Sequence, residues 1–316
     1  RVSPGGHRVS TAFDQLHIEH NAPISTWFHI GGGAQRLARP TMGEELRHCL
    51  ELDDELRVLG EGANLLVDDD GITDLVVSLQ QGAFTDCQID EKTGLVHAGA
   101  GVALPGLINR CVRSGLGGLE KLAGIPATLG GAVIMNAGGA FGELSQFIVQ
   151  VEAIDRAGRT HAYDRVSIDF GYRQSLLNHL IITGVVLQLE PGDPDEIARS
   201  RAECMKYKAQ SQPLGDKSAG CVFKNPTLIE PIEDIAEAGQ RVSAGMLIDR
   251  TGCKGLSVGG ASVSQVHANF ITTSADARAS HVIELIEQVR HRVLDRFGVS
   301  LDTELVIWSK NKEPAS

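Results

Sequence analysis

Three glycine-rich clusters in the first half of the sequence constrain most strongly what this chain can fold into. They are residues 30–34 (IGGGA), residues 60–64 (GEGAN) and the longer stretch 124–139. Glycine readily adopts positive φ angles and lets the backbone approach a ligand, so successive N–H groups can form an anion-binding concavity. For any one cluster, tight turns and close packing are the better explanation, since G-x-G by itself is common. Three such clusters before residue 140 favour a ligand that bears phosphate.

Two common phosphate-binding signatures are missing from the sequence. Gly60-Glu61-Gly62 continues with Ala63-Asn64 and does not complete the dinucleotide motif G-x-G-x-x-G, and no G-K-[ST] of a Walker loop occurs. The chain therefore needs a different phosphate-binding fold.

Composition narrows the class of partner. The 316 residues include 29 Lys and Arg against 40 Asp and Glu, which gives a net charge of −11 and disfavours nucleic acid and anionic membranes as partners. No apolar run approaches the about 20 residues that cross a bilayer, so no membrane insertion is expected. The six cysteines form no C-x-x-C pair and are predicted to be reduced thiols of a cytosolic protein.

Hydrophobic periodicity predicts an α+β protein. Helices are expected at residues 41–52, 104–114, 196–209, 243–248 and 276–297. Strands are expected at residues 56–59, 75–79 and 95–99 and within 151–190. Residues 119–139 are expected to form a buried loop, and residues 191–194 a linker with a domain break near residue 200.

The order of several longer motifs resembles one flavoprotein family. Residues 24–34 (ISTWFHIGGGA) and 59–67 (LGEGANLLV) look like the start of a flavin domain of the para-cresol methylhydroxylase or vanillyl-alcohol oxidase type. Residues 124–138 (GIPATLGGAVIMNAG) resemble the second flavin loop of the UDP-N-acetylenolpyruvoylglucosamine reductases, the MurB family. The same family order continues through residues 170–175 (FGYRQS), 218–226 (SAGCVFKNP), 247–270 and 301–307 (LDTELVI). The stretch 247–270 resembles the second type of this family.

The resemblance implies an FAD-binding domain of two α/β subdomains, residues 1–85 and 86–200, followed by a C-terminal α+β substrate-binding domain, residues 201–316. Residues 301–316 are expected to pack back on the first subdomain. In this family NADPH reduces non-covalently bound FAD, and the reduced flavin delivers hydride from N5 to UDP-N-acetylglucosamine enolpyruvate. The product is UDP-N-acetylmuramate, a peptidoglycan precursor. The resemblance also implies a bacterial cytoplasmic enzyme without a metal, which we expect to be a monomer or weak dimer.

Three residues match the family's catalytic positions. Arg173 would stabilise the enolate-like intermediate, because a guanidinium stays protonated and pairs with a carboxylate through two parallel bonds. Glu304 would assist stabilisation and protonation, although Val306 stands where other members commonly have an arginine. Cys221 occupies the position of the serine found in many members and is assigned as the proton donor, since a thiol with a reference pKa of about 8.5 is a better acid than an alcohol.

The resemblance also implies two sets of binding residues. Those expected to contact FAD are Gly62, Ala63, Asn64, Leu65, Gly99, Gly101, Gly124, Ile125, Thr128, Gly131 and Asn136. Those expected to contact the substrate are Tyr172, Gln212, Lys224, Asn225, His267 and Asn269. For His267 and Asn269 a purely structural hydrogen-bonding role is an equally good interpretation.

Two other functions fit parts of the sequence. A flavin oxidase of the same domain type would often tether FAD through a histidine, and the glycine-rich loops contain none. A catalytically silent flavoprotein would be expected to lack the acid or the cation, yet Arg173, Cys221 and Glu304 are all chemically suitable. The sequence therefore favours the reductase.

Overall fold

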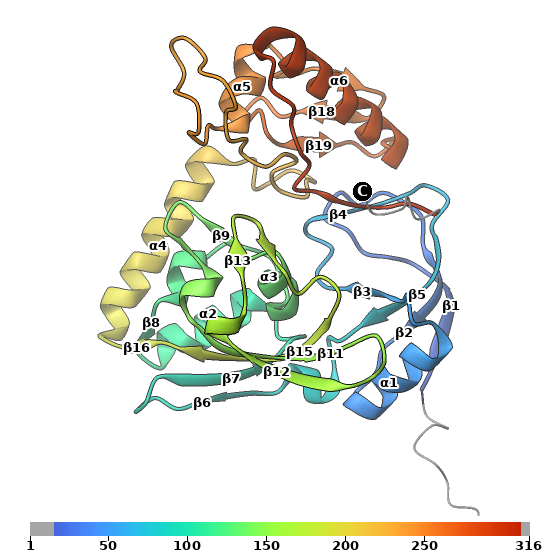
Figure 1. Ribbon diagram of the computed structural model, residues 1–316, viewed down its shortest axis with the longest axis vertical. Helices are drawn as coiled ribbons and strands as arrows, with labels where there is room; N and C mark the ends of the chain where they lie inside the picture. Colours follow the sequence, from blue (N-terminus) through green and yellow to red (C-terminus); the bar gives the residue numbers. More distant parts are fainter. Residues whose placement is uncertain (1–15, 311–316) are drawn as a thin grey trace, which may run out of the picture.

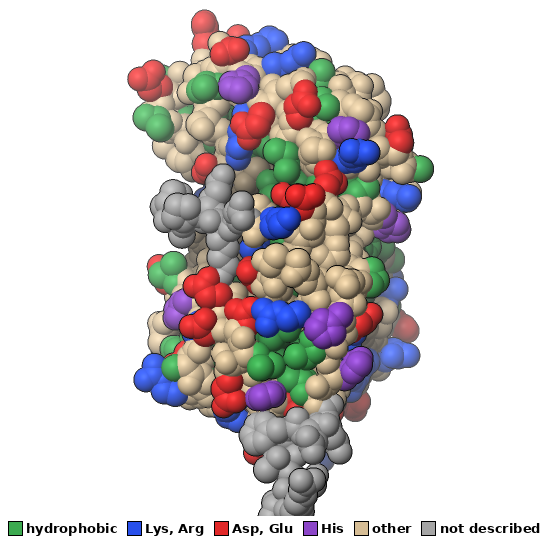
Figure 2. All heavy atoms as spheres, turned by 90° about the vertical axis from the view of Figure 1, so that its right-hand side faces the viewer, with side chains coloured by type: hydrophobic (Ala, Val, Ile, Leu, Met, Phe, Trp, Pro, Cys, Tyr) green, Lys and Arg blue, Asp and Glu red, His purple; other side chains and the backbone are tan. Residues whose placement is uncertain are grey.

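The computed structural model of the protein describes residues 16–310, and these form two sheet-containing units and a C-terminal α+β unit (Figure 1). The mixture of helices and strands and the additional C-terminal domain confirm the predicted fold class. No helix among the described residues is long and apolar enough to span a membrane. Acidic and basic side chains are intermixed on the face that Figure 2 shows, and no continuous basic surface extends over it.

The first unit is a four-stranded sheet with the order β1-β2-β5-β3. Strands β2, β5 and β3 run parallel, while β1 is antiparallel to β2. Its apolar side chains, among them Leu37, Ile72 and Val76, form a small buried cluster. The elements of this unit are β1 (Ile18–Ala22), β2 (Ala34–Ala38), α1 (Gly43–Leu52), β3 (Arg57–Leu59), β4 (Leu65–Val67) and β5 (Ile72–Ser78).

The second unit is a five-stranded antiparallel sheet with the order β12-β11-β15-β7-β6. Helix α2 buries Leu107, Ile108 and Cys111 in the same core, which is the largest hydrophobic cluster of the protein. Its elements are η2 (Gly82–Thr85), β6 (Cys87–Ile89), β7 (Leu95–Gly99), α2 (Leu104–Arg113), β8 (Leu116–Gly117), η4 (Leu144–Gln146), β11 (Ile148–Ile154), β12 (Thr160–Asp164), η5 (Arg165–Ser167), β13 (Phe170–Gly171), β14 (Gln174–Ser175), β15 (Ile181–Gln188) and β16 (Glu190–Pro191).

The stretch from residue 119 to 139 is not the loop that its glycines predict. It contains η3 (Leu119–Leu122), α3 (Leu129–Ile134) and β9 (Gly138–Gly139), which pairs with β10 (Gly142–Glu143). The side chain of Thr128 caps α3 by accepting from the N–H of Gly131 at 3.3 Å. Small residues let α3 approach the sheet, because a Cβ on Gly130 would lie 2.9 Å from the Cβ of Ala100. Tertiary packing therefore overrides the weak helix propensity of glycine here.

Helix α4 (Pro194–Ser211) begins earlier than predicted and runs through residue 200. The expected linker becomes its start, with Pro194 in the first turn and the Asp193 side chain capping the N–H of Asp195. Ile197 belongs to the core of the second unit, so the first half of α4 packs against that unit. The chain passes into the C-terminal unit only after the helix ends.

The C-terminal unit packs α6 against a three-stranded antiparallel sheet. Its core includes Phe28 and Leu66 from the first unit, so the hydrophobic interior is continuous across the boundary. The carboxylate of Asp69 accepts from the N–H groups of Ala279 and Ser280, at 2.8 and 3.1 Å, and thereby caps α6 from the first unit. The elements are α5 (Ala244–Arg250), β17 (Ser257–Val258), β18 (Ala261–Val263), β19 (Ile271–Thr273), α6 (Ala279–Phe297) and β20 (Val306–Trp308).

Strand β20 leaves the C-terminal unit and pairs in parallel with β4 of the first unit (Figure 1). The chain therefore returns to the glycine-rich loop 60–64 directly before β4. This return brings the end of the described chain beside the loop that is expected to hold FAD.

Candidate active site

Cys221 and Glu304 are held on adjacent backbone segments of the C-terminal unit. Cys221 forms an antiparallel bridge with Phe270. The N–H of Glu304 donates to the carbonyl of Val222, the residue that follows Cys221, at 2.8 Å. Backbone hydrogen bonds thus fix the predicted proton donor and the predicted glutamate relative to each other.

Arg173 reaches this segment from the second unit. It lies in the turn between β13 and β14 with a φ of 56°, a left-handed conformation that residues other than glycine seldom adopt. Its Nε atom is 2.8 Å from Oε1 of Glu304, and the exposed fractions of the two side chains are only 19% and 15%. A terminal guanidinium nitrogen donates to the carbonyl of Gly138 at 2.8 Å. The structure therefore brings two predicted catalytic residues from different units into one buried ion pair.

The surroundings of Cys221 and Glu304 change their acidity. Burial raises the pKa of the Cys221 thiol to about 12, and the negative charge of Glu304 acts in the same direction, while Arg173 and the side chain of Asn269 oppose the shift. Burial also raises the pKa of the Glu304 carboxyl, although the nearby Arg173 works against this. The thiol is therefore a weaker acid than its reference value suggests, and it stays protonated at neutral pH.

Asn64 connects the glycine-rich loop 60–64 to the predicted catalytic residue Glu304. Its side-chain Nδ2 donates to the backbone carbonyl of Glu304 at 2.9 Å. Its own carbonyl accepts from the N–H of Val306 at 3.1 Å. The loop that is expected to bind FAD thus also positions Glu304.

A cavity of about 320 Å³ opens beside the buried ion pair. Three of its lining residues, Tyr172, Lys224 and Asn225, are among the predicted substrate contacts. The side-chain oxygen of Asn225 accepts from the N–H of Ala244 at 2.9 Å, which orients the amide at the start of α5. The remaining lining residues are Gln174, Pro226, Thr227, Arg241, Ser300 and Asp302.

The loop before β4 fits a ligand that bears pyrophosphate. The N–H groups of Gly62, Ala63 and Asn64 donate no hydrogen bond to any residue in the described part of the chain. Gly62 has a φ of 64°, and a Cβ there would lie 2.1 Å from the carbonyl oxygen of Ser25. Consecutive free amides in such a turn form an anion-binding concavity. This loop also lies beside Thr128, because a Cβ on Gly60 would be 2.8 Å from its hydroxyl.

Two other predicted FAD contacts, Asn136 and Gly101, are held by contacts within the protein. The side chain of Asn136 is buried; it donates to the carbonyl of Gly171 and accepts from the N–H of Ser145. It therefore joins the glycine-rich stretch 124–139 to the turn that bears Arg173. Gly101 sits against the carbonyl of Leu79, where a Cβ would be 1.9 Å away. Close packing of the chain accounts for this glycine without a ligand.

The remaining predicted FAD contacts lie in the same loops and elements. Leu65 is buried in β4, Gly99 ends β7, Gly124 and Ile125 follow η3, and Gly131 lies in the first turn of α3.

The structure gives Asn269 and His267 structural contacts. Both ends of the buried Asn269 amide bind the backbone of Phe223, at 2.9 and 2.8 Å. The Nδ1 atom of His267 accepts from the N–H of Asn269 at 3.2 Å. Burial lowers the pKa of His267, so the imidazole is neutral at pH 7. Gln212 ends α4 and is not among the residues that line the cavity.

Two basic residues that sequence reasoning missed belong to the site. Lys208 of α4 is buried beside Gly124, where a Cβ would lie 3.1 Å from its Cδ. Burial, and to a smaller extent the charge of Arg173, lower its pKa to about 8. Arg241 lines the cavity next to Tyr172. The highly charged sequence of α4 concealed the buried lysine, and Arg241 lies outside the recognised motifs.

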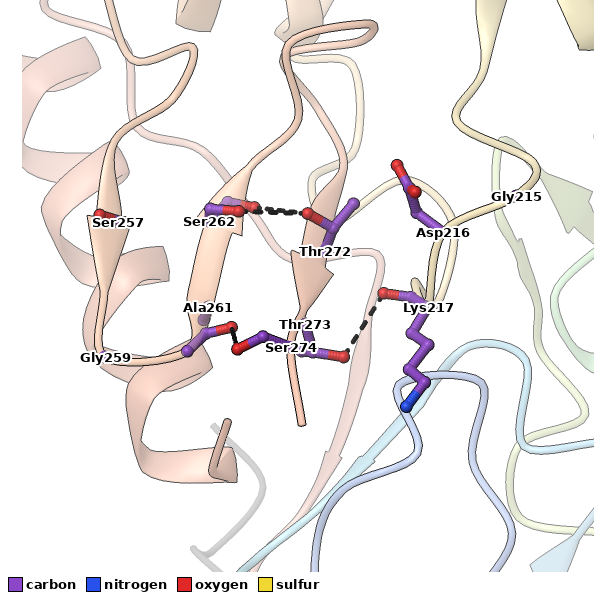
Figure 3. Close-up of a pocket in the computed structure, with 11 residues that line it drawn as sticks. Gly215, Asp216, Lys217, Ser257, Gly259, Ala261, Ser262, Thr272, Thr273 and Ser274 are labelled. Atoms are coloured by element: carbon purple, nitrogen blue, oxygen red, sulfur yellow. Dashed lines mark hydrogen bonds between the residues drawn. The ribbon is translucent and has the colours of Figure 1, made fainter. Parts of the chain in front are cut away.

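A second cavity, of about 530 Å³, lies between the loop 215–217 and the sheet β17–β19 (Figure 3). None of the predicted catalytic residues lines it. The hydroxyls of Ser262 and Thr272 are 3.2 Å apart and bond to each other, and that of Thr273 bonds to the carbonyls of Phe28 and Lys217. These hydroxyl groups are already satisfied within the protein.

Two models of known protein families match this chain. A family model described as an FAD binding domain matches residues 39–164, which together with the fold and the site makes the protein an FAD-dependent oxidoreductase. A second family model, for the C-terminal domain of UDP-N-acetylenolpyruvoylglucosamine reductase, matches residues 212–308.

Full-length relatives agree with these matches. The reductase of Moorella thermoacetica is 40% identical over 304 residues, which cover 94% of this chain and 95% of that protein. The reductase of Synechococcus sp. (strain CC9605) is 37% identical and covers 90% of this chain and 92% of its own length. The crystal structure of the Thermus caldophilus reductase (MurB) matches with a TM-score of 0.76 and 39% identity, over 93% of this chain and 100% of that chain. The chain therefore belongs to the UDP-N-acetylenolpyruvoylglucosamine reductase family, whose function lies in peptidoglycan synthesis.

Proposed function

We propose that this protein reduces UDP-N-acetylglucosamine enolpyruvate to UDP-N-acetylmuramate with NADPH as the electron donor. The observation that supports this most is the buried ion pair between Arg173 and Glu304, at 2.8 Å, because the backbone N–H of Glu304 donates to Val222, the residue after Cys221. A cation, a carboxylate and a protonated thiol meet at the junction of the flavin units and the C-terminal unit. This is the set of groups that reduction of an enolpyruvyl double bond requires.

FAD supplies hydride chemistry when it is bound and reduced. The free amides of Gly62, Ala63 and Asn64 would hold its pyrophosphate, and the loop that begins at Gly124 would lie along the rest of the cofactor. Because Asn64 also binds the carbonyl of Glu304, cofactor binding and the position of the glutamate are coupled through one residue.

Arg173 would bind the carboxylate of the enolpyruvyl group. Hydride addition to the β carbon moves the electron pair of the double bond to the α carbon, and the substrate becomes an enolate with increased negative charge. A guanidinium fixed by Gly138 and Glu304 needs little reorganisation to stabilise that charge. These two contacts of Arg173 are formed within the protein itself.

Cys221 completes the reaction by giving its S–H proton to the α carbon. Because the pKa of this thiol is raised to about 12, the donor is fully protonated at pH 7. The resulting thiolate is a strong base in this environment and recovers its proton from solvent. The high pKa thus keeps the thiol protonated before the reaction, although it also makes the thiol a weaker acid.

The cavity beside Tyr172 would receive the diphosphate of the substrate. Lys224 contributes a cation to the lining, and Asn225 contributes an oriented amide. Lys224 forms no ion pair with a carboxylate among residues 16–310, so its charge is available to an anion.

The test is NADPH oxidation by the purified protein with and without the UDP-enolpyruvyl substrate. The proposal predicts rapid turnover only with the substrate, together with a flavin absorption band at about 450 nm. Oxygen consumption without the substrate would instead favour a flavin oxidase. A flavin spectrum with no turnover would favour a silent flavoprotein.

A further inference from the structure

The ring of Tyr172 is in contact with two guanidinium groups. The Cζ atom of Arg241 lies 4.1 Å from the ring centroid, and the Cζ atom of Arg173 lies 5.2 Å from it. Both distances are within the range in which a cation is attracted to an aromatic face. The ring therefore links an arginine of the open cavity to the arginine of the buried ion pair.

Tyr172 itself is held at the edge of the cavity. Its hydroxyl accepts from the N–H of Asn225 at 3.4 Å, and the residue is half-buried. Burial raises the pKa of this phenol, so the ring is uncharged over the neutral range. Because the ring is fixed and neutral and contacts both guanidinium groups, a shift of one guanidinium would move the ring and so change the position of the other.

Arg241 has few restraints other than this ring. It is exposed, and it forms no ion pair with any carboxylate in the described part of the chain. An isolated backbone bridge to Thr227 holds its main chain. Its guanidinium lines the same cavity as Lys224, so a diphosphate bound there would provide the counter-charge that Arg241 lacks.

Arg173, by contrast, depends on exact placement. It has a strained φ of 56°, and its buried Nε faces Glu304. A small rotation of the guanidinium would separate it from the substrate carboxylate, and the Gly138 carbonyl, Glu304 and the Tyr172 ring oppose that rotation.

We infer that Arg241 is a positioning residue, which binds the substrate diphosphate and, through the ring of Tyr172, fixes the guanidinium of Arg173. This inference rests on the proposed function, since it names a further residue for the same substrate. Its particular content is that Arg241 affects the rate of the chemical step as well as affinity. A residue that only bound diphosphate would affect affinity alone.

The experiment is single-turnover reoxidation of the dithionite-reduced holoenzyme by the UDP-enolpyruvyl substrate, so NADPH binding does not enter. Arg241→Lys keeps the charge but loses the planar group that stacks on the ring. We expect its limiting rate at saturating substrate to fall about 3- to 10-fold, as the usual strength of a cation–π contact implies. Arg241→Gln should show the same loss of rate and a higher apparent Kd. The matched control is Arg199→Gln on the exposed surface of α4, which should react like the wild type.

A double-mutant cycle identifies the route of the effect. In a Tyr172→Leu background, Arg241→Lys should cause no further loss of limiting rate, because the ring that links the two arginines is gone. Additive losses would overturn the inference. An Arg241→Lys variant with the wild-type limiting rate and only a changed Kd would overturn it as well. If the reduced wild-type enzyme is not reoxidised by the substrate, the proposed function itself fails, whereas a normal wild type with an unaffected Arg241→Lys rejects the inference alone.

Discussion

Charged side chains are paired in the proposed catalytic cluster of Arg173, Glu304 and Cys221, whereas those of the adjoining cavity are not paired with a carboxylate among residues 16–310. In the cluster, Arg173 and Glu304 are largely inaccessible to water and form an ion pair. In the cavity, Lys224 and Arg241 lie at a more accessible surface and have no carboxylate partner among residues 16–310. A buried charge must be paired because desolvation is costly, but an accessible cation keeps its hydration until an anion displaces the water.

This difference between the two regions suggests that one controls the rate of the chemical step and the other controls the affinity for the substrate. Groups in the buried cluster have fixed positions and altered acidity, so they should determine the rate of the chemical step. Groups in the cavity are free to meet the ligand, so they should determine affinity. Arg241 is the exception that would join the two regions, and the following predictions test how sharply the regions differ.

The largest effect is expected from Cys221→Ala. Loss of a positioned general acid should slow reoxidation of the flavin by substrate about 10²- to 10⁴-fold. Reduction of the flavin by NADPH should be unaffected, and rapid mixing can follow both half-reactions separately. Cys221→Ser keeps a proton donor and should retain most of the rate. Equal loss in both half-reactions would show that Cys221 is structural.

Arg173→Lys should have the second largest effect. The ammonium cannot reproduce the fork that contacts Gly138 and Glu304, so stabilisation of the enolate is weakened. We expect the limiting rate of single-turnover reoxidation to fall about 10- to 100-fold, since hydrogen bonds to charged groups contribute about 1.5–3 kcal/mol each. An unchanged rate would exclude Arg173 from contact with the intermediate.

Lys224→Met tests the cavity in the same assay. Removal of an accessible cation should raise the Kd of the substrate about 10-fold, as the loss of a charge-assisted hydrogen bond implies, while the limiting rate stays near that of the wild type. Lys92→Met, in an exposed turn before β7, is the matched control for removal of a charge. A fall in limiting rate without a change in Kd would abolish the distinction between the two regions.

The pH dependence should show the smallest change. A Cys221 pKa of about 12 keeps the donor protonated, so the limiting rate should vary less than about 2-fold between pH 7 and pH 10. On the acid side, the raised pKa of Glu304 means that its carboxylate is lost at a higher pH than for an ordinary glutamate. Glu304→Gln should therefore remove any acidic limb of the profile. A fall in rate centred near pH 8.5 that persists in a Lys208→Met variant, which lacks the lysine with a pKa of about 8, would mean that the thiol has an unperturbed pKa.

Much of the fold was predictable because its signals are local. The apolar spacing of residues 282–297 marks α6, and the alternating segments between residues 151 and 188 mark β11, β12 and β15. Residues 129–134 were predicted as loop and form α3, because packing against the sheet outweighs the glycines. Local propensity could not reveal that contact.

In the candidate site, too, the residue identities were predictable from the sequence, but their surroundings were not. The motifs pointed to Arg173, Cys221 and Glu304, and the structure places the first and last of these 2.8 Å apart. The inward position of Asn136 and the burial of Lys208 were not predictable, because each depends on neighbours that are distant in the sequence.

The sequence by itself determined the family, the flavin-binding class and the chemical types of the proposed catalytic groups, since these depend on residue identity within continuous motifs. Only the tertiary structure decided how those groups act. It raised the pKa of Cys221, paired Arg173 with Glu304 and brought Arg241 to Tyr172. Acidity and pairing depend on burial and on distances between segments, and these are established only when the separate units pack together.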